Sequence, residues 1–146
     1  RPMIFNRLRI DYPLSDHQKI PRKNGIFLTD VWDDIRELTS GYFAGDEPYR
    51  DMSGERSHKQ QSPISLLLRI ILSSTMPGHV ILDPFAGTGT TLAVSVQMNR
   101  YGIGIEIDKR NTDIITSRLQ HIRDIDNIQK YMEYYRFTEN IENICK

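Results

Sequence analysis

Hydrophobic residues follow a helical period in the middle of the chain. Apolar side chains recur at spacings of three and four residues, which places them on one face of a helix, at Ile64, Leu67, Leu68, Ile71 and Leu72. Directly before them, Ser62 suits the N-cap and Pro63 the first helical position, where its missing N–H costs nothing. Pro77-Gly78 then ends the predicted helix.

Short apolar runs alternate with helical segments over the next forty or so residues. Residues 80–82 (Val-Ile-Leu) suit a buried parallel strand, and 101–107 predict a second strand. Residues 90–99 and 109–123 have helical patterns, the latter with the inward positions Ile114, Ile115, Leu119 and Ile122. Strand, helix, strand, helix is the βαβ alternation of a doubly wound sheet.

The two ends of the chain have weaker patterns. The first 25 residues predict a loop with a short strand at 3–8, and 26–32 is an extended apolar stretch. A polar, glycine-containing loop is expected from 36 to 57. Near the C-terminus, one amphipathic helix over 125–146 is predicted from the spacing of Ile125, Ile128, Met132 and Tyr135. These patterns divide the chain into an arm (1–28), an α/β core (29–124) and this C-terminal helix.

Composition places the chain among ordinary globular domains. It has 146 residues, 38% of them apolar and 26% charged, enough for one domain with a core. No apolar run approaches the roughly 20 residues that cross a bilayer, and residues 1–9 lack the apolar segment of a signal peptide. The single cysteine, Cys145, excludes an internal disulfide and fits a reducing compartment. A cytoplasmic location is expected.

Charge is neutral in total but unevenly distributed. Lys plus Arg and Asp plus Glu both number 19, whereas residues 1–28 have a net charge of +4 from six basic and two acidic side chains. The basic ones are Arg1, Arg7, Arg9, Lys19, Arg22 and Lys23. A basic arm on an acidic body fits contact with DNA, and it fits a solvated surface loop equally well.

A glycine-containing turn lies where the first predicted strand meets the next helix. In this Asp-Pro-Phe-Ala-Gly-Thr-Gly-Thr-Thr segment, residues 83–91, Gly87 and Gly89 allow a sharp turn and close approach of a ligand. Glu106 ends the second strand, 19 residues after Gly87. An acid at that point can accept hydrogen bonds from the ribose hydroxyls of an adenosine-containing ligand.

The neighbouring residues discriminate between adenosine ligands. A nucleoside triphosphate loop needs Lys after its last glycine, but Thr90 follows Gly89. A dinucleotide fingerprint needs a third glycine where Leu92 stands, and the carboxylate of Asp83 would repel a pyrophosphate. S-adenosylmethionine carries an ammonium and a sulfonium, so a nearby carboxylate favours it. No metal site is expected.

Several segments together resemble the bacterial DNA amino-methyltransferases, which methylate adenine N6 or cytosine N4. Residues 83–91 resemble motif I of that family and 102–108 (Gly-Ile-Gly-Ile-Glu-Ile-Asp) resemble motif II. The segment 58–63 with the helix after it is similar to motif X, and 30–32 (Asp-Val-Trp) to the tripeptide that follows the target-recognition region. The order X, I, II is that of the circularly permuted β group.

The resemblance implies a Rossmann-like methyltransferase fold of three layers, α/β/α, and S-adenosylmethionine as cofactor. It also implies double-stranded DNA as partner, and makes residues 1–28 the end of a recognition region or a linker. The fold is expected to be incomplete, because the strand that precedes the catalytic motif is missing. The expected cofactor-binding residues are Asp83, Phe85, Ala86, Gly87, Thr88, Gly89, Thr90, Glu106, Ile107, His58, Gln61 and Ser62.

The chain departs from the family pattern in two places. Ser62 replaces the motif X lysine, whose charge Lys59 could supply, while His58 and Gln61 match but also fit a polar loop before a helix. The catalytic motif, Asp/Asn/Ser-Pro-Pro-Tyr/Phe, is absent. The nearest segment, 46–49 (Asp-Glu-Pro-Tyr), follows a polar loop and is expected to be a turn. We therefore expect no catalytic residue.

Two classes of function follow from these motifs. The first is the cofactor-binding part of a DNA methyltransferase, for adenine N6 foremost and cytosine N4 as the other choice, completed by its own missing half or as a homodimer. The second is a non-catalytic binding module, a remnant, or a subunit that needs a second chain. An RNA or small-molecule methyltransferase is disfavoured by the permuted order.

Overall fold

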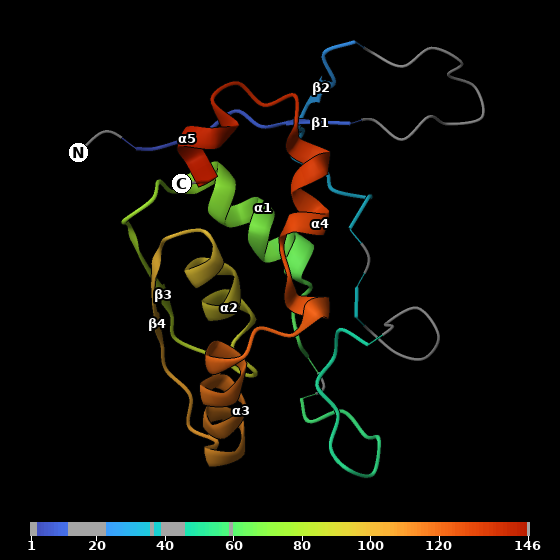
Figure 1. Cartoon of the computed structure of the whole chain (residues 1–146), viewed down its shortest axis with the longest axis vertical. Helices are drawn as coiled ribbons and strands as arrows, with labels where there is room; N and C mark the ends of the chain where they lie inside the picture. Colours follow the sequence, from blue (N-terminus) through green and yellow to red (C-terminus); the bar gives the residue numbers. More distant parts are fainter. Residues whose placement is uncertain (1–2, 12–22, 36, 39–45, 59, 146) are drawn as a thin grey trace.

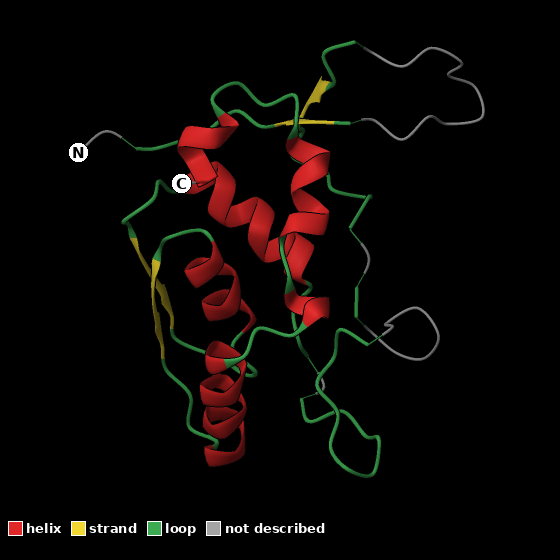
Figure 2. Cartoon of the chain, in the orientation of Figure 1, coloured by secondary structure: helices red, strands yellow, loops and turns green. Residues whose placement is uncertain are grey.

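Two small sheets and five α-helices make up the described part of the chain (Figures 1 and 2). The computed structural model describes residues 3–11, 23–35, 37–38, 46–58 and 60–145. The strands are β1 (Arg9–Ile10), β2 (Ile26–Phe27), β3 (Val80–Asp83) and β4 (Tyr101–Gly104). The α-helices are α1 (Ile64–Ser74), α2 (Thr90–Gln97), α3 (Lys109–Gln120), α4 (Gln129–Met132) and α5 (Ile141–Cys145).

A parallel β3–α2–β4 unit is the centre of the α/β part. β3 and β4 pair in parallel, with Val80 opposite Tyr101 and Asp83 opposite Gly104. Both strands therefore end at the same edge, where the glycine-containing turn begins α2. This arrangement confirms the predicted strand, helix and strand and the Rossmann-like α/β class.

Glycines in β4 let α2 lie directly on the sheet. A Cβ built on Gly102 would come within 2.7 Å of a Leu92 side-chain carbon, and one on Gly104 equally close to another carbon of Leu92. A side chain at either position would displace the Leu92 side chain from the sheet. The residues of α2 that face inward, including Ala93 and Val94, are buried.

The apolar core lies mainly between α1, α2 and the C-terminal segment. It includes Leu68 and Leu72 of α1 and Met98 after α2, together with Leu8, Ile10, Ile128, Tyr135 and Ile144. The antiparallel β1–β2 ribbon packs on this core from the end near α4 and α5 (Figure 1). The described residues among the first 28 thus contribute β1, β2 and core side chains to the same unit.

One face of the β3–β4 sheet is bare in the described chain. Its side chains are 52–69% exposed, although all are apolar or aromatic: Val80, Leu82, Tyr101, Ile103 and Ile105. The opposite face carries α2. The described part of the chain therefore contains two of the three expected layers, in keeping with an incomplete fold. No described helix is long and apolar enough to span a membrane.

Three local predictions were wrong. Helix α1 begins one residue later than expected: Pro63 is the N-cap in an extended conformation, and Ser62 is exposed. The buried residues of α3 are Asn111 and Arg118, while Leu119 is 40% exposed. The strand expected at 3–8 is β1 at Arg9–Ile10 instead.

The predicted single C-terminal helix is also wrong, because the segment is broken into short pieces. A 3₁₀ turn at Asp124–Asp126 precedes α4, a second at Glu133–Tyr135 follows it, and α5 comes after a residue with positive φ, Asn140. The apolar positions Ile128 and Tyr135 still face the core. The first 3₁₀ turn contacts α3 through Asp126 and Arg118, and the second contacts α1 through Tyr135 and Arg69.

Candidate functional site

The turn after β3 is held in a fixed shape by its own backbone. Gly87 and Gly89 both have positive φ, 53° and 77°, which suits glycine. The N–H of Gly89 donates to the carbonyl of Ala86 at 2.7 Å, and Ala86 N–H donates to Ile105 at 2.9 Å. A Cβ on Gly89 would lie 2.8 Å from an Ile115 side-chain carbon, so this glycine also lets α3 approach.

Two carboxylates flank this turn. Asp83 is the last residue of β3, whereas Glu106 lies two residues beyond the end of β4 at Gly104, because β4 is shorter than the strand predicted at 101–107. Glu106 accepts hydrogen bonds from the N–H of Gly87 and of Asp108, both at 2.8 Å. The Asp108 and Gly87 N–H groups hold the pKa of Glu106 below its usual value despite some desolvation, so it is ionised at neutral pH. Asp83 accepts from the N–H of Phe85 at 3.0 Å. The edge therefore favours a cationic ligand.

The outer and inner residues of the turn differ sharply in exposure. Phe85 is 88% exposed and Ile107 fully exposed, and both lie beside the two carboxylates. Ala86, Thr88 and Thr90 are buried. The exposed pair is available to cover a flat ring system, whereas Thr88 and Thr90 have their side chains inside the protein.

The two matching motif X residues do reach the turn. The His58 ring lies 3.6 Å from the position that a Cβ on Gly87 would take. Gln61 is buried; its amide oxygen accepts from the Thr88 hydroxyl and from Tyr49 N–H, both at 3.1 Å, and its NH₂ group donates to the Glu47 carbonyl. Gln61 is thus occupied in holding three segments together. Lys59 lies outside the described residues.

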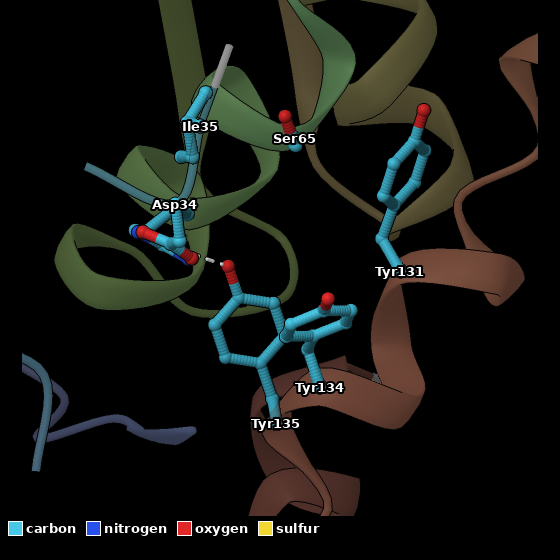
Figure 3. A pocket seen from close by; sticks show the side chains of 7 residues that line it. Asp34, Ile35, Ser65, Tyr131, Tyr134 and Tyr135 are labelled. Atoms are coloured by element: carbon cyan, nitrogen blue, oxygen red, sulfur yellow. Dashed lines mark hydrogen bonds and ion pairs between the residues drawn. The ribbon is translucent and has the colours of Figure 1, made fainter. Parts of the chain in front are cut away.

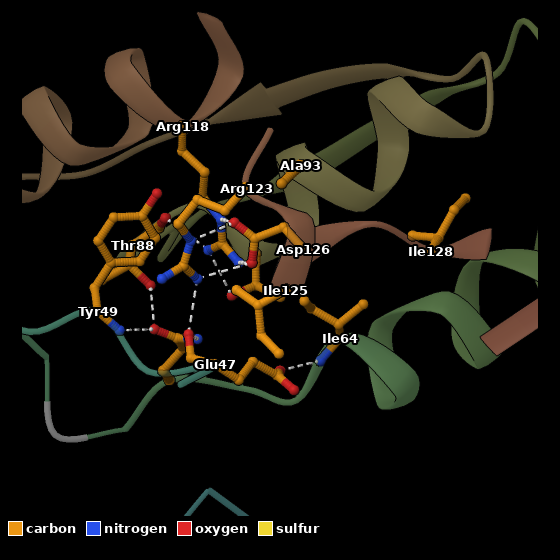
Figure 4. Close-up of polar contacts among 12 residues, drawn as sticks. Glu47, Tyr49, Ile64, Thr88, Ala93, Arg118, Arg123, Ile125, Asp126 and Ile128 are labelled. Atoms are coloured by element: carbon orange, nitrogen blue, oxygen red, sulfur yellow. Dashed lines mark hydrogen bonds and ion pairs between the residues drawn. The ribbon is translucent and has the colours of Figure 1, made fainter. Parts of the chain in front are cut away.

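The segment 46–49, which we expected to be a turn, anchors α1. Glu47 is buried and its carboxylate accepts from Ile64 N–H at 2.7 Å, so it caps the helix from 17 residues away (Figure 4). Tyr49 lies under the Arg123 guanidinium, 3.8 Å from its ring centre. Burial raises the pKa of Glu47, although the Ile64 N–H opposes this. These contacts are structural.

A buried ion cluster lies behind the turn (Figure 4). The side chains of Arg118 and Asp126 are fully buried and 2.7 Å apart, and Arg123 also binds Asp126 at 2.7 Å. Burial alone would raise the pKa of Asp126, but the hydrogen bonds from Arg123 and Arg118 outweigh it and lower that pKa. Nothing in the sequence pattern had predicted this cluster. The feature that could have indicated it is the spacing of Arg118, which lies three and four residues after Ile115 and Ile114 and so on the same face of the helix.

A second polar cluster surrounds a small pocket between α1 and the C-terminal segment (Figure 3). The pocket has a volume of about 140 Å³ and is lined by Asp34, Ile35, Ser65, Arg69 and three tyrosines. Buried Arg69 donates to Asp34 at 2.7 Å and to the Tyr135 hydroxyl at 2.9 Å. These bonds fix residues 32–35 against the core. No metal-binding group of three or more His, Cys, Asp or Glu occurs among the described residues.

The family of the chain follows from its sequence match. Residues 2–117 match the model of the DNA methylase family N6_N4_Mtase. The chain belongs to this family. The expected relationship to bacterial DNA amino-methyltransferases is thereby confirmed. The match ends before Arg118, Arg123 and Asp126.

Two curated relatives are type II methyltransferases. The chain is 46% identical to M.HinfI of Haemophilus influenzae over 79 residues, 54% of this chain and 22% of that protein. It is 40% identical to M.BamHI of Bacillus amyloliquefaciens over 132 residues, 83% of this chain and 28% of that protein. The chain thus spans about a quarter of the length of these relatives.

A solved structure with local similarity is the M1.HpyAVI–SAM complex. It is 35% identical, with a TM-score of 0.43, over 44% of this chain and 32% of that one. M1.HpyAVI without a named ligand gives 28% identity and a TM-score of 0.40, over 51% and 42% of the two chains.

Proposed function

We propose that this chain is the S-adenosylmethionine-binding part of a DNA methyltransferase that acts on an exocyclic base amine. The observation that carries the proposal is the edge where β3 and β4 end. There a fixed glycine turn lies between two carboxylates, Asp83 and Glu106, and the second is ionised and pinned by two backbone N–H groups.

The residues of this edge fit the cofactor in charge and shape. The two Glu106 oxygens accept the N–H groups of Gly87 and Asp108, and the Asn111 side chain and Ile107 N–H also contribute, to a smaller extent. A carboxylate has about four acceptor positions, so a ribose hydroxyl can still bind from the solvent side. Asp83 would lie near the ammonium group, and Phe85 and Ile107 are free to cover the adenine. The backbone of residues 85–89 would complete the site, with Ala86, Thr88 and Thr90 behind it and His58, Gln61 and Ser62 from the motif X segment.

The chain's contribution to catalysis would be positioning. When bound, S-adenosylmethionine supplies a methyl group on a sulfonium. Glu106 and the turn would hold the donor in one orientation, so that the amine can approach in line. The amine itself must be held by the Pro-Pro-Tyr type of motif, which this sequence lacks. We propose that the complete enzyme obtains it from a further segment or a second protomer.

Adenine N6 is the proposed target, with cytosine N4 as the second choice, and double-stranded DNA is the proposed partner. The net charge of +4 on residues 1–28 supports DNA contact. Two of these basic side chains, Arg7 and Arg9, lie together on the Phe27 ring, at 4.2 and 3.8 Å from its centre. The remaining candidate is a binding subunit without catalysis of its own. Glu47 stands where the catalytic motif would need its first proline, and its carboxylate instead caps α1 at Ile64 N–H. This structural role favours a non-catalytic binding subunit as the description of the chain alone.

Calorimetry tests the proposed function directly. We expect the chain to bind S-adenosylmethionine, and to bind ATP and NAD much more weakly, because the two carboxylates repel phosphates. ATP or NAD binding as tight as that of S-adenosylmethionine would contradict the proposal. A chain that binds none of the three would contradict it as well.

A further inference from the structure

We infer that Arg118 is a positioning residue for the cofactor turn, locked in place by Asp126. This inference rests on the proposed function, since the turn is where the cofactor would bind. It concerns residues beyond the stretch that matches the family model, which ends at residue 117.

Arg118 reaches the inner side of the turn with one nitrogen. Its Nη1 donates to the carbonyl of Thr88 and to the hydroxyl of Thr90, both at 3.0 Å (Figure 4). Thr88 lies between the two glycines with positive φ, Gly87 and Gly89. Glycines permit many backbone conformations, so the turn is least rigid at this point. The hydrogen bond from buried Arg118 to the Thr88 carbonyl therefore restricts the backbone where it would otherwise be most free.

Asp126 fixes the other side of the same guanidinium. Nε and Nη2 of Arg118 donate to the two Asp126 oxygens at 3.0 and 2.7 Å, in the bidentate geometry that only arginine provides. Arg118 is 1% exposed and Asp126 0%, so neither side chain has room for another arrangement. The C-terminal segment thereby sets the shape of a turn nearly forty residues earlier in the sequence.

Arg123 completes the cluster from the outside without touching the turn. It donates to Asp126 at 2.7 Å and to the Glu47 carbonyl at 2.8 Å. Two arginines share one carboxylate, and Glu47 also interacts electrostatically with both of them. On the side that faces the turn, Arg118 has the Thr88 carbonyl and the Thr90 hydroxyl as acceptors.

The chain offers a matched control in a second buried arginine. Arg100 is 3% exposed and also donates to backbone carbonyls, those of Met98 and Thr75 at 2.6 and 3.1 Å. It follows the C-terminal end of α2, whereas the cofactor turn precedes the N-terminal end. Arg118→Lys and Arg100→Lys therefore make the same chemical change. The first acts on the N-terminal end of α2 through Thr88 and Thr90, and the second acts at its C-terminal end.

Amide hydrogen exchange in the ligand-free chain tests the inference. The amides of Gly87 and Gly89 are both hydrogen-bonded in the turn. In Arg118→Lys we expect these two amides to exchange at least about tenfold faster. Each lost charge-assisted hydrogen bond lowers the free energy of local opening by enough to raise the population of the open turn about tenfold. In Arg100→Lys they should exchange as in the wild type. Unchanged exchange in Arg118→Lys, or equal acceleration in both variants, would overturn the inference.

A milder pair of variants covers the case in which Arg118→Lys does not fold. Thr90→Val removes one acceptor of Arg118 but leaves its ion pair, and Thr90→Ser keeps the hydroxyl. We expect faster exchange at Gly89 in the first and a wild-type rate in the second. Equal rates in both would count against the role of Arg118.

Cofactor affinity separates this inference from the proposed function. If both hold, the Kd for S-adenosylmethionine rises about tenfold in Arg118→Lys and less than about twofold in Arg100→Lys, even where the two lose similar thermal stability. If the wild type binds no S-adenosylmethionine, the proposed function fails, while the exchange data still decide whether Arg118 holds the turn. If the wild type binds it and Arg118→Lys binds equally well, the inference alone fails.

Discussion

Glu106 accepts a hydrogen bond from the N–H of Gly87 at 2.8 Å, and this contact joins the turn after β3 to the segment that follows β4. The acid expected to hold a ribose thus also orders the turn that would hold the rest of the cofactor. Glu106 forms part of the turn's structure before any ligand binds.

Replacement of Glu106 by alanine should weaken S-adenosylmethionine binding by about 1–3 kcal/mol, the usual cost of losing charge-assisted hydrogen bonds. Calorimetry gives the affinity, and Asp113→Ala on the exposed side of α3 is the control, expected to bind as the wild type. Equal affinity for wild type and Glu106→Ala would show that the ribose lies elsewhere.

Glu47 should make stability depend on pH in an unusual direction. Burial raises its pKa in the folded state, so the folded protein binds this proton more tightly than the unfolded chain. The stabilising contribution is present below the ordinary glutamate pKa and is lost as pH rises through the raised value. Glu47→Gln keeps an acceptor for Ile64 N–H and should remove this loss. Denaturant titrations from about pH 4 to 7 measure the free energy of unfolding of both proteins. The same dependence of this free energy on pH in wild type and Glu47→Gln would refute the prediction.

The bare face of β3–β4 should contribute little to the stability of this chain. Ile103 is 52% exposed, whereas Leu68 is fully buried. Ile103→Thr should change the free energy of unfolding by less than about 0.5 kcal/mol, and Leu68→Ala should lower it by about 2–5 kcal/mol. A loss above about 1 kcal/mol for Ile103→Thr would mean that this face is covered in solution.

Neutralising the basic arm should weaken binding to double-stranded DNA. The variant replaces Arg7, Arg9, Arg22 and Lys23 by glutamine; Arg22 lies outside the described residues. Each lost phosphate contact should reduce the slope of log K against log salt by about 0.9. Fluorescence anisotropy across a salt series measures the slope. An unchanged slope would mean that these charges only solvate the surface.

The chain by itself should not methylate DNA, because it lacks the Asp/Asn/Ser-Pro-Pro-Tyr/Phe motif that holds the amine. Transfer of labelled methyl groups to mixed-sequence DNA, with protein free of other methyltransferases, tests this. We expect no incorporation above a heat-inactivated sample. Incorporation that Asp46→Ala abolishes would show that residues 46–49 are catalytic after all.

The sequence alone determined the βαβ unit and its candidate cofactor edge. Local signals suffice there: an apolar run, glycines in a turn and an acid at a strand end are short-range features, and the topology of a parallel pair brings the two strand ends together. Family membership followed from the same segments. Periodicity was less reliable near the C-terminus, where the expected helix is broken at Asn140 and by two 3₁₀ turns.

Only the tertiary structure decided what the charged residues do. Glu47 caps α1 from 17 residues away, and Arg118 and Asp126 meet behind the turn as a buried pair. From sequence alone, a charged residue is predicted to be exposed to solvent, because burying an unpaired charge costs much free energy. These charges can be buried because distant segments supply their partners, and the fold alone determines which segments meet.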